Sequence, residues 1–189
     1  MRKAHARERI LDAAGKLFQE RGYSQVGVNE IIATADTAKA SFYHYFSSKE
    51  TLCQAWLEAI HHRSDASREA LLKSGKSPAE KIDQYFAELE KFLVSSHFRG
   101  CPYSNTGAVV SCESRGISEQ IQNHKESIRD FFQMICSEHF TDKKEARRMA
   151  DHLFLLYSGA TTESQNMKDI WPAKSAREAA GLLMRKKKS

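Results

Sequence analysis

The sequence predicts an all-α protein, in which a small N-terminal head of about three helices precedes a larger helical bundle. Apolar residues recur at the three- and four-residue spacing of a helix through most of the chain. The 189 residues include only three prolines and nine glycines, which favours helices over a turn-rich β fold. The sequence contains neither internal repeats nor convincing strand patterns.

The first predicted helix covers about residues 4–20, and Gly22 is placed to end it. Its apolar residues fall on one face, which we expect to be buried in the head. The members of this face are Ala6, Ile10, Ala13, Ala14, Leu17 and Phe18.

Residues 24–50, SQVGVNEIIATADTAKASFYHYFSSKE, predict two short helices joined by a tight turn. Asp36 tolerates the left-handed backbone of a turn, and Thr37 is the predicted cap of the second helix. In a helix-turn-helix, the second helix enters the major groove of DNA. The predicted inward residues are Val28, Ile31, Ile32 and Ala35 in the first helix and Ala38, Phe42, Tyr45 and Phe46 in the second.

The helix that follows has the spacing of a capping box at Ser47 and Glu50, and it extends to about residue 72. A helix of this length would belong to the head at its start and to a second domain at its end. The next predicted helix starts at Ser77-Pro78, with Glu80 set to cap it, and carries an apolar face that includes Phe92. Further amphipathic helices are predicted over about residues 117–135, from a start formed by Asp142 with Glu145 to beyond Ala160, and after Trp171-Pro172.

Residues 6–60 resemble the DNA-binding domain of the tetracycline-repressor (TetR) family of transcriptional regulators. The most specific part is the run Lys39-Ala40-Ser41-Phe42-Tyr43-His44-Tyr45-Phe46, followed by Ser48-Lys49-Glu50. Gly27 stands where relatives usually have a capping Ser or Thr, and Asp36 stands where they usually have glycine. Glycine is still an acceptable N-cap. The resemblance implies a helix-turn-helix DNA-binding domain over residues 1–47 and a helical effector-binding and dimerisation domain over residues 48–189.

The resemblance also implies which side chains contact DNA. Lysine and tyrosine reach phosphate, alanine can touch a thymine methyl group, and serine or histidine can donate to either kind of acceptor. Arg2 and Lys3 could form an additional arm. The implied contact residues are Gly27, Asn29, Lys39, Ala40, Ser41, Tyr43, His44 and Lys49.

One head reads only a few base pairs, so useful affinity requires a homodimer on a two-fold site. The stretch 153–160 is apolar on all sides, and residues 176–184 are rich in alanine and leucine. A helix that is apolar all round is buried on both sides, here against its own bundle and against a partner. The alternative is that both stretches are purely intramolecular core. The predicted dimerisation residues are Leu153, Leu156, Ala160, Ala180 and Leu183.

The segment 98–112, FRGCPYSNTGAVVSC, resembles the Gly-Cys segment with a following Asn that many TetR-family members have near the effector pocket. Some relatives have an acidic residue shortly after that Asn, where this chain has Val109, so a less polar pocket and a non-cationic effector are expected. Helical spacing makes each nearby aromatic more often a core residue than a ligand contact. The candidate effector-binding residues are Tyr85, Leu89, Cys101, Tyr103, Asn105, Phe131, Ile135 and Tyr157.

Four cysteines, at positions 53, 101, 112 and 136, show no CxxC pair, which predicts free thiols in a reducing cytoplasm. Oxidation or alkylation of Cys101 is an alternative switch, since a helix is predicted to begin there. His97 with Cys101, and Cys136 with His139, have the spacing of two metal ligands, but a structural zinc site needs four. We therefore expect neither a metal nor another cofactor.

The net charge of +5 is weak evidence for nucleic-acid binding. The run Arg185-Lys186-Lys187-Lys188 supplies four of these charges, and without it 25 basic residues face 24 acidic ones. No stretch approaches the roughly 18 consecutive apolar residues of a membrane span. No apolar segment follows the basic start MRKAHARER, so neither a membrane partner nor an export signal is expected.

The sequence therefore predicts a homodimeric repressor that binds a near-palindromic operator in double-stranded DNA and is released by a small-molecule effector. One rival is an enzyme with a cysteine nucleophile, but no nucleophile elbow, phosphate loop or metal-protease spacing supports it, and we expect no catalytic residue. A second rival is an architectural protein that binds DNA of any sequence.

Overall fold

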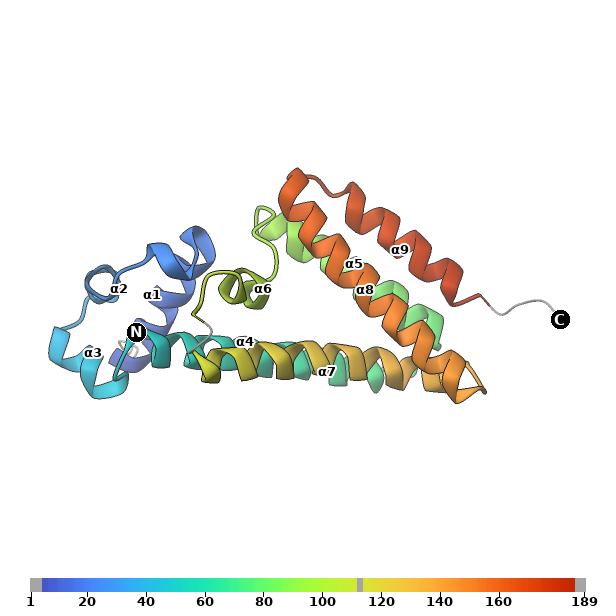
Figure 1. Cartoon of the computed structure of the whole chain (residues 1–189), viewed down its shortest axis with the longest axis horizontal. Coiled ribbons are helices and arrows are strands. Elements are labelled where there is room, and N and C mark those ends of the chain that lie inside the picture. Colours follow the sequence, from blue (N-terminus) through green and yellow to red (C-terminus); the bar gives the residue numbers. More distant parts are fainter. Residues whose placement is uncertain (1–4, 112–113, 186–189) are drawn as a thin grey trace. The chain divides into compact units, whose positions relative to one another are not determined.

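The computed structural model describes residues 5–111 and 114–185, and the regular structure in these ranges is entirely helical, which confirms the predicted fold class (Figure 1). The predicted arm residues Arg2 and Lys3, Cys112 and the tail residues 186–188 lie outside the described residues. The helices are α1 (Ala6–Arg21), α2 (Val28–Thr34), α3 (Lys39–Tyr45), α4 (Lys49–Leu72), α5 (Pro78–Ser95), α6 (Pro102–Gly107), α7 (Arg115–His139), α8 (Lys143–Met167) and α9 (Trp171–Leu183), with a 3-10 turn at Tyr23–Gln25.

The chain forms two compact units. The first contains Met1–Arg63 and Pro102–Asn123, and the second contains Ser64–Cys101 and His124–Ser189. Helices α4 and α7 each contribute residues to both units. The boundary that we expect between residues 47 and 48 separates the DNA-binding domain from the effector-binding and dimerisation domain. It stays a prediction. Of the helices in the described part of the chain, none is long and apolar enough to cross a membrane.

The first unit is built on α1, whose inner face packs against the 3-10 turn and α4. Ile10 and Ala14 are fully buried, and the ring of Phe18 meets those of Tyr23 and Trp56 edge-on at 5.5 and 5.4 Å. Five of the six residues of the predicted buried face are buried, and Ala6 is half-buried. Gly22 ends the helix as predicted, because its φ of 87° turns the backbone and its N–H donates to the Phe18 carbonyl.

The turn between α2 and α3 has the predicted left-handed residue, since Asp36 has a φ of 47°. The predicted cap at Thr37 is wrong. The N-cap residue is Ala38, which has no capping side chain, because α3 begins one residue later than the pattern indicates. The cap of α4 is also shifted by one residue. Thr51 N–H donates to Ser48 Oγ at 3.1 Å and Ser48 N–H donates to Thr51 Oγ1 at 3.0 Å, in place of a Ser47–Glu50 box.

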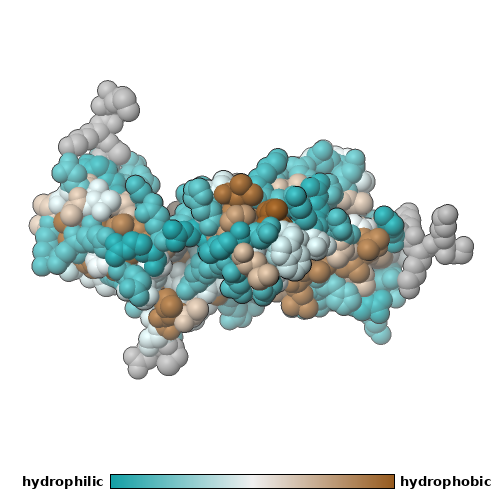
Figure 2. Space-filling model, turned by 90° about the horizontal axis from the view of Figure 1, so that it is seen from above, coloured by the Kyte–Doolittle hydropathy of each residue, from teal (hydrophilic) through white to brown (hydrophobic). Residues whose placement is uncertain are grey.

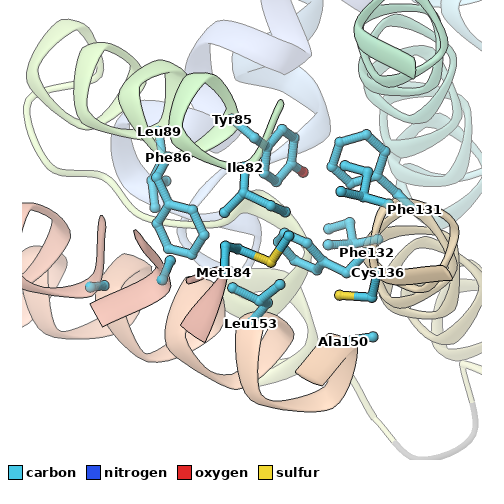
Figure 3. Packing of buried hydrophobic residues seen from close by; sticks show 14 of the residues in the cluster. Ile82, Tyr85, Phe86, Leu89, Phe131, Phe132, Cys136, Ala150, Leu153 and Met184 are labelled. Carbon is cyan, nitrogen blue, oxygen red and sulfur yellow. The ribbon is translucent and has the colours of Figure 1, made fainter. Parts of the chain in front are cut away.

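The second unit has a continuous hydrophobic core formed by α5, α7, α8 and α9. Figure 3 shows Tyr85, Phe131, Phe132, Leu153 and Met184 converging from these helices. Ser77 and Glu80 form the predicted capping box at the start of α5, and Asp142 caps α8 with its side chain. Phe92 on α5 is 37% exposed, contrary to the buried face predicted for it. Leu155 on α8 and Leu182 on α9 also point outward, from the two stretches that are predicted to meet a partner.

Ion pairs join the helices of the second unit. Arg177 on α9 donates to both carboxylate oxygens of Asp83 on α5 at 2.7 Å. Arg129 on α7 makes a similar two-bond contact with Asp151 on α8, at 2.6 and 3.0 Å. These contacts fix the relative rotation of neighbouring helices, although partly exposed pairs of this kind contribute little stability each, about 0–1 kcal/mol.

Candidate functional site

Helix α3 is held down by two aromatic side chains and exposes the residues opposite them. Phe42 is fully buried, and Phe46 follows it with a ring-centre distance of 6.2 Å. Lys39, Ala40 and His44 are exposed, Ser41 is half-buried, and Tyr43 keeps 49% of its surface accessible. The structure therefore gathers these five predicted DNA contacts on one short helix.

Two residues of the inward face predicted for this helix are exposed. Ala38 is the N-cap residue and lies outside the helix, and Tyr45 is 40% exposed. Helix α3 ends at Tyr45, and the next residue, Phe46, leaves the helical path with a φ of −138°. This extended residue turns its ring into the core, where the helical pattern had placed Tyr45. Tyr45 instead packs edge-on against His44 on the surface, at a ring-centre distance of 4.8 Å.

The turn before α3 is held by an arginine that the sequence pattern did not reveal. Arg9 on α1 donates from Nε to the Ala35 carbonyl and from an Nη atom to the Asp36 carbonyl, both at 3.0 Å. A planar guanidinium binds two adjacent carbonyls with little freedom of orientation. Arg9 thus fixes the position at which α3 starts. Carbonyl acceptors belong to the backbone of every residue, so no side-chain pattern marks this contact.

The remaining predicted DNA contacts are at the starts of α2 and α4. Gly27 is the exposed N-cap of α2, and Asn29 is exposed in its first turn. Lys49 is the first residue of α4, and its Nζ lies 4.3 Å from the centre of the Tyr23 ring. Partial burial lowers the pKa of Lys49, and the nearby Cys53 opposes this shift. The Lys49 ammonium is therefore positioned by the Tyr23 ring.

The predicted effector-binding residues are distributed over both units. Tyr85, Leu89, Cys101, Phe131, Ile135 and Tyr157 belong to the second unit, whereas Tyr103 and Asn105 belong to the first. In the second unit, the Tyr85 ring lies 4.7 Å from the Phe131 ring and stacks on the Tyr157 ring at 5.1 Å. Leu89 and Ile135 are part of the hydrophobic core. In the first unit, Tyr103 donates from its hydroxyl to the Leu57 carbonyl at 2.6 Å.

A buried arginine in the second unit was also missed by the sequence pattern. Only 4% of the Arg68 side chain on α4 is exposed, and its guanidinium contacts Ser64, Asp65 and Ser127. Its sequence neighbours Ser67 and Glu69 are exposed, so the segment reads as an ordinary solvated stretch of helix. The burial of Arg68 arises from α7, which supplies Ser127 from a distant part of the chain.

The three cysteines within the described ranges differ in environment. Burial raises the pKa of Cys53 and of Cys136 to about 12. Cys101 is only half-buried, and the Lys125 Nζ donates to its sulfur at 3.7 Å. Gly100 before it has a φ of +74°, and a Cβ there would collide with the side chain of Gln165. The left-handed backbone at position 100 therefore favours glycine, and a larger residue there would require the Gln165 side chain to move.

An apolar groove runs between α8 and α9, with a volume of about 860 Å³. Three of the predicted dimerisation residues, Leu156, Ala160 and Leu183, line it. The other two, Leu153 and Ala180, are 0% and 1% exposed, so the protomer itself already buries them. Figure 2 shows one face of the molecule, where apolar patches interrupt a mostly hydrophilic surface. The groove is also lined by three large apolar side chains that are more than half exposed: Leu155, Trp171 and Leu182.

No group of three or more His, Cys, Asp or Glu side chains in the described residues is arranged to hold a metal ion. Cys136 is fully buried, and the half-buried His139 that follows it packs edge-on against Phe140 at a ring-centre distance of 4.7 Å. The chemistry available in the described structure is therefore that of hydrogen-bond donors, acceptors, aromatic rings and one accessible thiol.

Residues 10–56 match the model of a family described as bacterial regulatory proteins, tetR family. The chain is similar to the HTH-type transcriptional repressor NemR of Escherichia coli K12, with 27% identity over 180 residues that cover 90% of this chain and 89% of NemR. It is also similar to the HTH-type transcriptional regulator LmrA of Bacillus subtilis, with 32% identity over 119 residues. That match covers 60% of this chain and 62% of LmrA.

Solved structures of regulators share the fold. The reduced form of E. coli NemR has a TM-score of 0.81 at 24% identity and covers 94% of this chain and 96% of its own. SCO4454, a TetR-family transcriptional regulator from Streptomyces coelicolor, has a TM-score of 0.88 at 21% identity and covers 96% of this chain and 89% of its own. At these identities, the similarity shows a common arrangement of helices.

Proposed function

Because this chain belongs to the TetR family of transcriptional regulators, we propose that it is a repressor that binds a near-palindromic operator in double-stranded DNA as a homodimer. A small-molecule effector that binds the C-terminal bundle releases it from the operator. In this proposal Lys39, Ala40, Ser41 and His44 contact bases or phosphates, and Tyr43 contacts phosphate.

The outer face of α3 carries this proposal. Exposed lysine, tyrosine and histidine side chains on a helix whose opposite face is anchored by Phe42 and Phe46 are positioned to enter a major groove. The backbone clamp from Arg9 fixes the start of this helix. Such preorganisation reduces the ordering entropy that binding to DNA costs. Gly27, Asn29 and Lys49 would add contacts from the starts of α2 and α4.

The α8–α9 groove supports dimerisation. Its apolar lining and its exposed Leu155, Leu182 and Trp171 are unusual for a surface that faces only water. Gly159 and Ala160 leave room for a partner helix to approach closely. A second copy related by a two-fold axis would bury the same surface on both chains and provide two recognition helices for one operator.

Helix α4 supports coupling between the effector and DNA. It starts at Lys49, a proposed DNA contact, and ends at Leu72, beyond Arg68 in the second unit. A shift of this helix on effector binding would change the spacing of the two recognition helices in the dimer. A coupling free energy of about 1–3 kcal/mol is typical of such linkage.

A switch at Cys101 is the second candidate mechanism for this regulator. Among the described cysteines, Cys101 is half-buried whereas the other two are buried. The Lys125 ammonium donates to the Cys101 sulfur at 3.7 Å. E. coli NemR, to which the chain is similar, has a solved structure of its reduced form. In this mechanism, peroxide treatment releases the protein from the operator, and Cys101→Ser abolishes this release.

A cysteine-dependent enzyme is less well supported, because the relatives are named as transcriptional regulators. Turnover of a simple substrate that is lost on Cys101→Ala would favour the enzyme. An architectural protein would bind random and selected DNA equally, with a steep dependence on salt. These two rivals therefore make predictions that differ from those of a sequence-specific repressor.

The test is selection of bound sequences from a random duplex library at about physiological salt, followed by titration of the selected sequence against shuffled DNA. We expect a near-palindromic motif that is bound roughly 10³-fold or more tightly than shuffled DNA. Enrichment of no motif, together with binding that disappears as salt rises, would refute sequence-specific readout by α3.

A further inference from the structure

We propose that Arg68, together with the hydroxyl pair of Tyr85 and Tyr157, binds the carboxylate of a small organic acid. This acid is the effector, so its regulatory role rests on the function proposed above. Four features of the second unit support this site: a buried cation, a buried pair of tyrosine hydroxyls, an exchangeable counter-ion and a neighbouring set of aromatic rings.

The cation is Arg68. A guanidinium with only 4% of its side chain exposed has lost most of its hydration, so it needs acceptors in the protein. Most of the acceptors are neutral hydroxyls. The guanidinium donates to Ser64 Oγ at 2.7 Å, to Ser127 Oγ at 2.9 Å and to the hydroxyl of Tyr85. The carboxylate of Asp65 is the remaining partner.

A pair of buried tyrosine hydroxyls lies beside this cation. Tyr157 donates a hydrogen bond to Tyr85, and Arg68 also donates to Tyr85. An arginine only donates, so neither of these two bonds uses the Tyr85 O–H group as a donor. Burial raises the pKa of Tyr85 and of Tyr157, so both hydroxyls stay protonated at neutral pH. A buried O–H donor beside a buried cation fits an anionic acceptor.

The counter-ion can be exchanged. Asp65 lies three residues before Arg68 on α4, and 43% of its side chain is exposed, against 4% for Arg68. A carboxylate at such a position regains water if it rotates away from the guanidinium. A ligand carboxylate can then take its place without leaving a second charge buried. The exchange replaces one ion pair with another, so only a carboxylate or a similar anion is accommodated well.

The rest of the ligand would face aromatic rings. Tyr85 packs against Phe131 and Tyr157 at ring-centre distances of 4.7 and 5.1 Å. Figure 3 shows the Tyr85 hydroxyl on the side of the Phe131 ring. Flat or extended apolar groups pack well against such rings. The ligand class is therefore a compact acid with an aromatic or aliphatic body.

Matched acids and amides test this site on the wild-type protein. Isothermal titration calorimetry without DNA would compare benzoate, 4-hydroxybenzoate and hexanoate with benzamide, 4-hydroxybenzamide and hexanamide. Each amide keeps the shape of its acid and removes the charge. We expect at least one acid to bind roughly 10-fold or more tightly than its amide, because hydrogen bonds to a charged group are stronger.

Two variants locate the site. Arg68→Gln should abolish the preference for the acid, and Tyr85→Phe should weaken acid binding while it keeps the ring. Arg129→Gln is the matched control, because Arg129 is also paired with a carboxylate but lies 41% exposed on α7. It should leave the affinity for the acid unchanged. The wild-type comparison of acid with amide does not depend on how well either variant folds.

Three results would overturn the site: no acid in the panel binds, acid and amide bind equally, or Arg68→Gln keeps the acid preference. The role in regulation is measured separately with the selected operator. An acid that binds through Arg68 and leaves operator affinity unchanged would retain the site and refute its role as the switch. Failure to select any operator, with acid binding intact, would refute the proposed DNA function alone.

Discussion

At the scale of single residues, differences in burial give the cysteines different reactivities. A thiolate is the reactive form of a thiol, and desolvation disfavours it. Burial raises the pKa of Cys53 and Cys136 to about 12, whereas the half-buried Cys101 has a neighbouring ammonium donor in Lys125. Among the three cysteines in the described residues, the more accessible thiol, Cys101, therefore lies in the segment that resembles the family's effector region.

Alkylation should follow this order. In the native protein at pH 8, iodoacetamide should modify Cys101 before Cys53 and Cys136. Cys53 and Cys136 should be protected, because a thiol with a pKa of about 12 is ionised to the order of 10⁻⁴ at that pH. Peptide mass spectrometry over time measures each site, with protein in denaturant as the control in which all sites react. Labelling of Cys53 at the rate of Cys101 would contradict this order.

Two neighbouring side chains on α3 should affect DNA binding differently. Tyr43→Phe removes a proposed phosphate contact, so it should weaken binding to all sequences by a similar factor. His44→Ala removes a proposed base contact, so it should cost about 1–3 kcal/mol on the selected operator and relax preference at one position. Titrations against operators with single base changes measure both effects. Equal losses for both variants on every sequence would show that His44 does not read a base.

At the scale of helices, an ion pair between α9 and α5 links stability to pH. The hydrogen bonds from Arg177 hold the pKa of Asp83 below its ordinary value of 3.8. A depressed carboxylate pKa stabilises the fold above the ordinary value, and this contribution disappears as pH falls through the lower, folded-state pKa. Because the Asp83 side chain is 59% exposed, solvent screens the pair and its contribution is small.

Asp83→Asn should therefore lower the free energy of unfolding by about 0.5 kcal/mol at pH 7 in low salt. The difference from wild type should shrink as the pH falls through the folded-state pKa of Asp83, below 3.8, and also in 1 M salt at pH 7. Urea unfolding followed by circular dichroism measures these values. A difference that stays constant across pH and salt would mean that packing, and not charge, is responsible.

The helices themselves could largely be predicted from the sequence, because helical periodicity and caps are local properties. The Ser77–Glu80 box, the Asp142 cap and the Gly22 stop are confirmed. The caps at Thr37 and Ser47 were each misplaced by one residue. Neighbouring hydroxyl residues all satisfy the local pattern, and the packing of the helix decides between them.

The candidate sites could be predicted only where the motif is local. The outer face of α3 follows from helical spacing and from its resemblance to a family motif. Arg9 and Arg68 could not be found in this way, because their partners are backbone carbonyls or residues distant in sequence, such as Ser127. Leu155 and Leu182 are exposed in the protomer and lie in stretches predicted to meet a partner, but periodicity alone does not distinguish a protomer core from such a surface.

At the scale of the whole molecule, the proposed function requires two chains to act together. A recognition helix of seven residues contacts too few bases to select one operator alone. Two linked heads bind the second half-site at a high effective concentration, which raises affinity by roughly 10²–10⁴-fold without a new kind of contact. The α8–α9 groove should therefore determine operator affinity, although none of its residues is a proposed DNA contact.

Leu182→Glu tests this dependence. Leu182 is 59% exposed and lines the groove, so a charge there should leave the protomer folded and split the dimer by placing an unpaired carboxylate in an apolar interface. Sedimentation equilibrium should show a monomer at micromolar concentrations, and operator affinity should fall roughly 10²-fold or more.

Met134→Glu is the matched control, since Met134 is 54% exposed on α7 and does not line the groove. A dimeric Leu182→Glu protein, or a monomeric Met134→Glu protein, would place the interface elsewhere. A monomer that kept full operator affinity would instead mean that one head reads the operator alone.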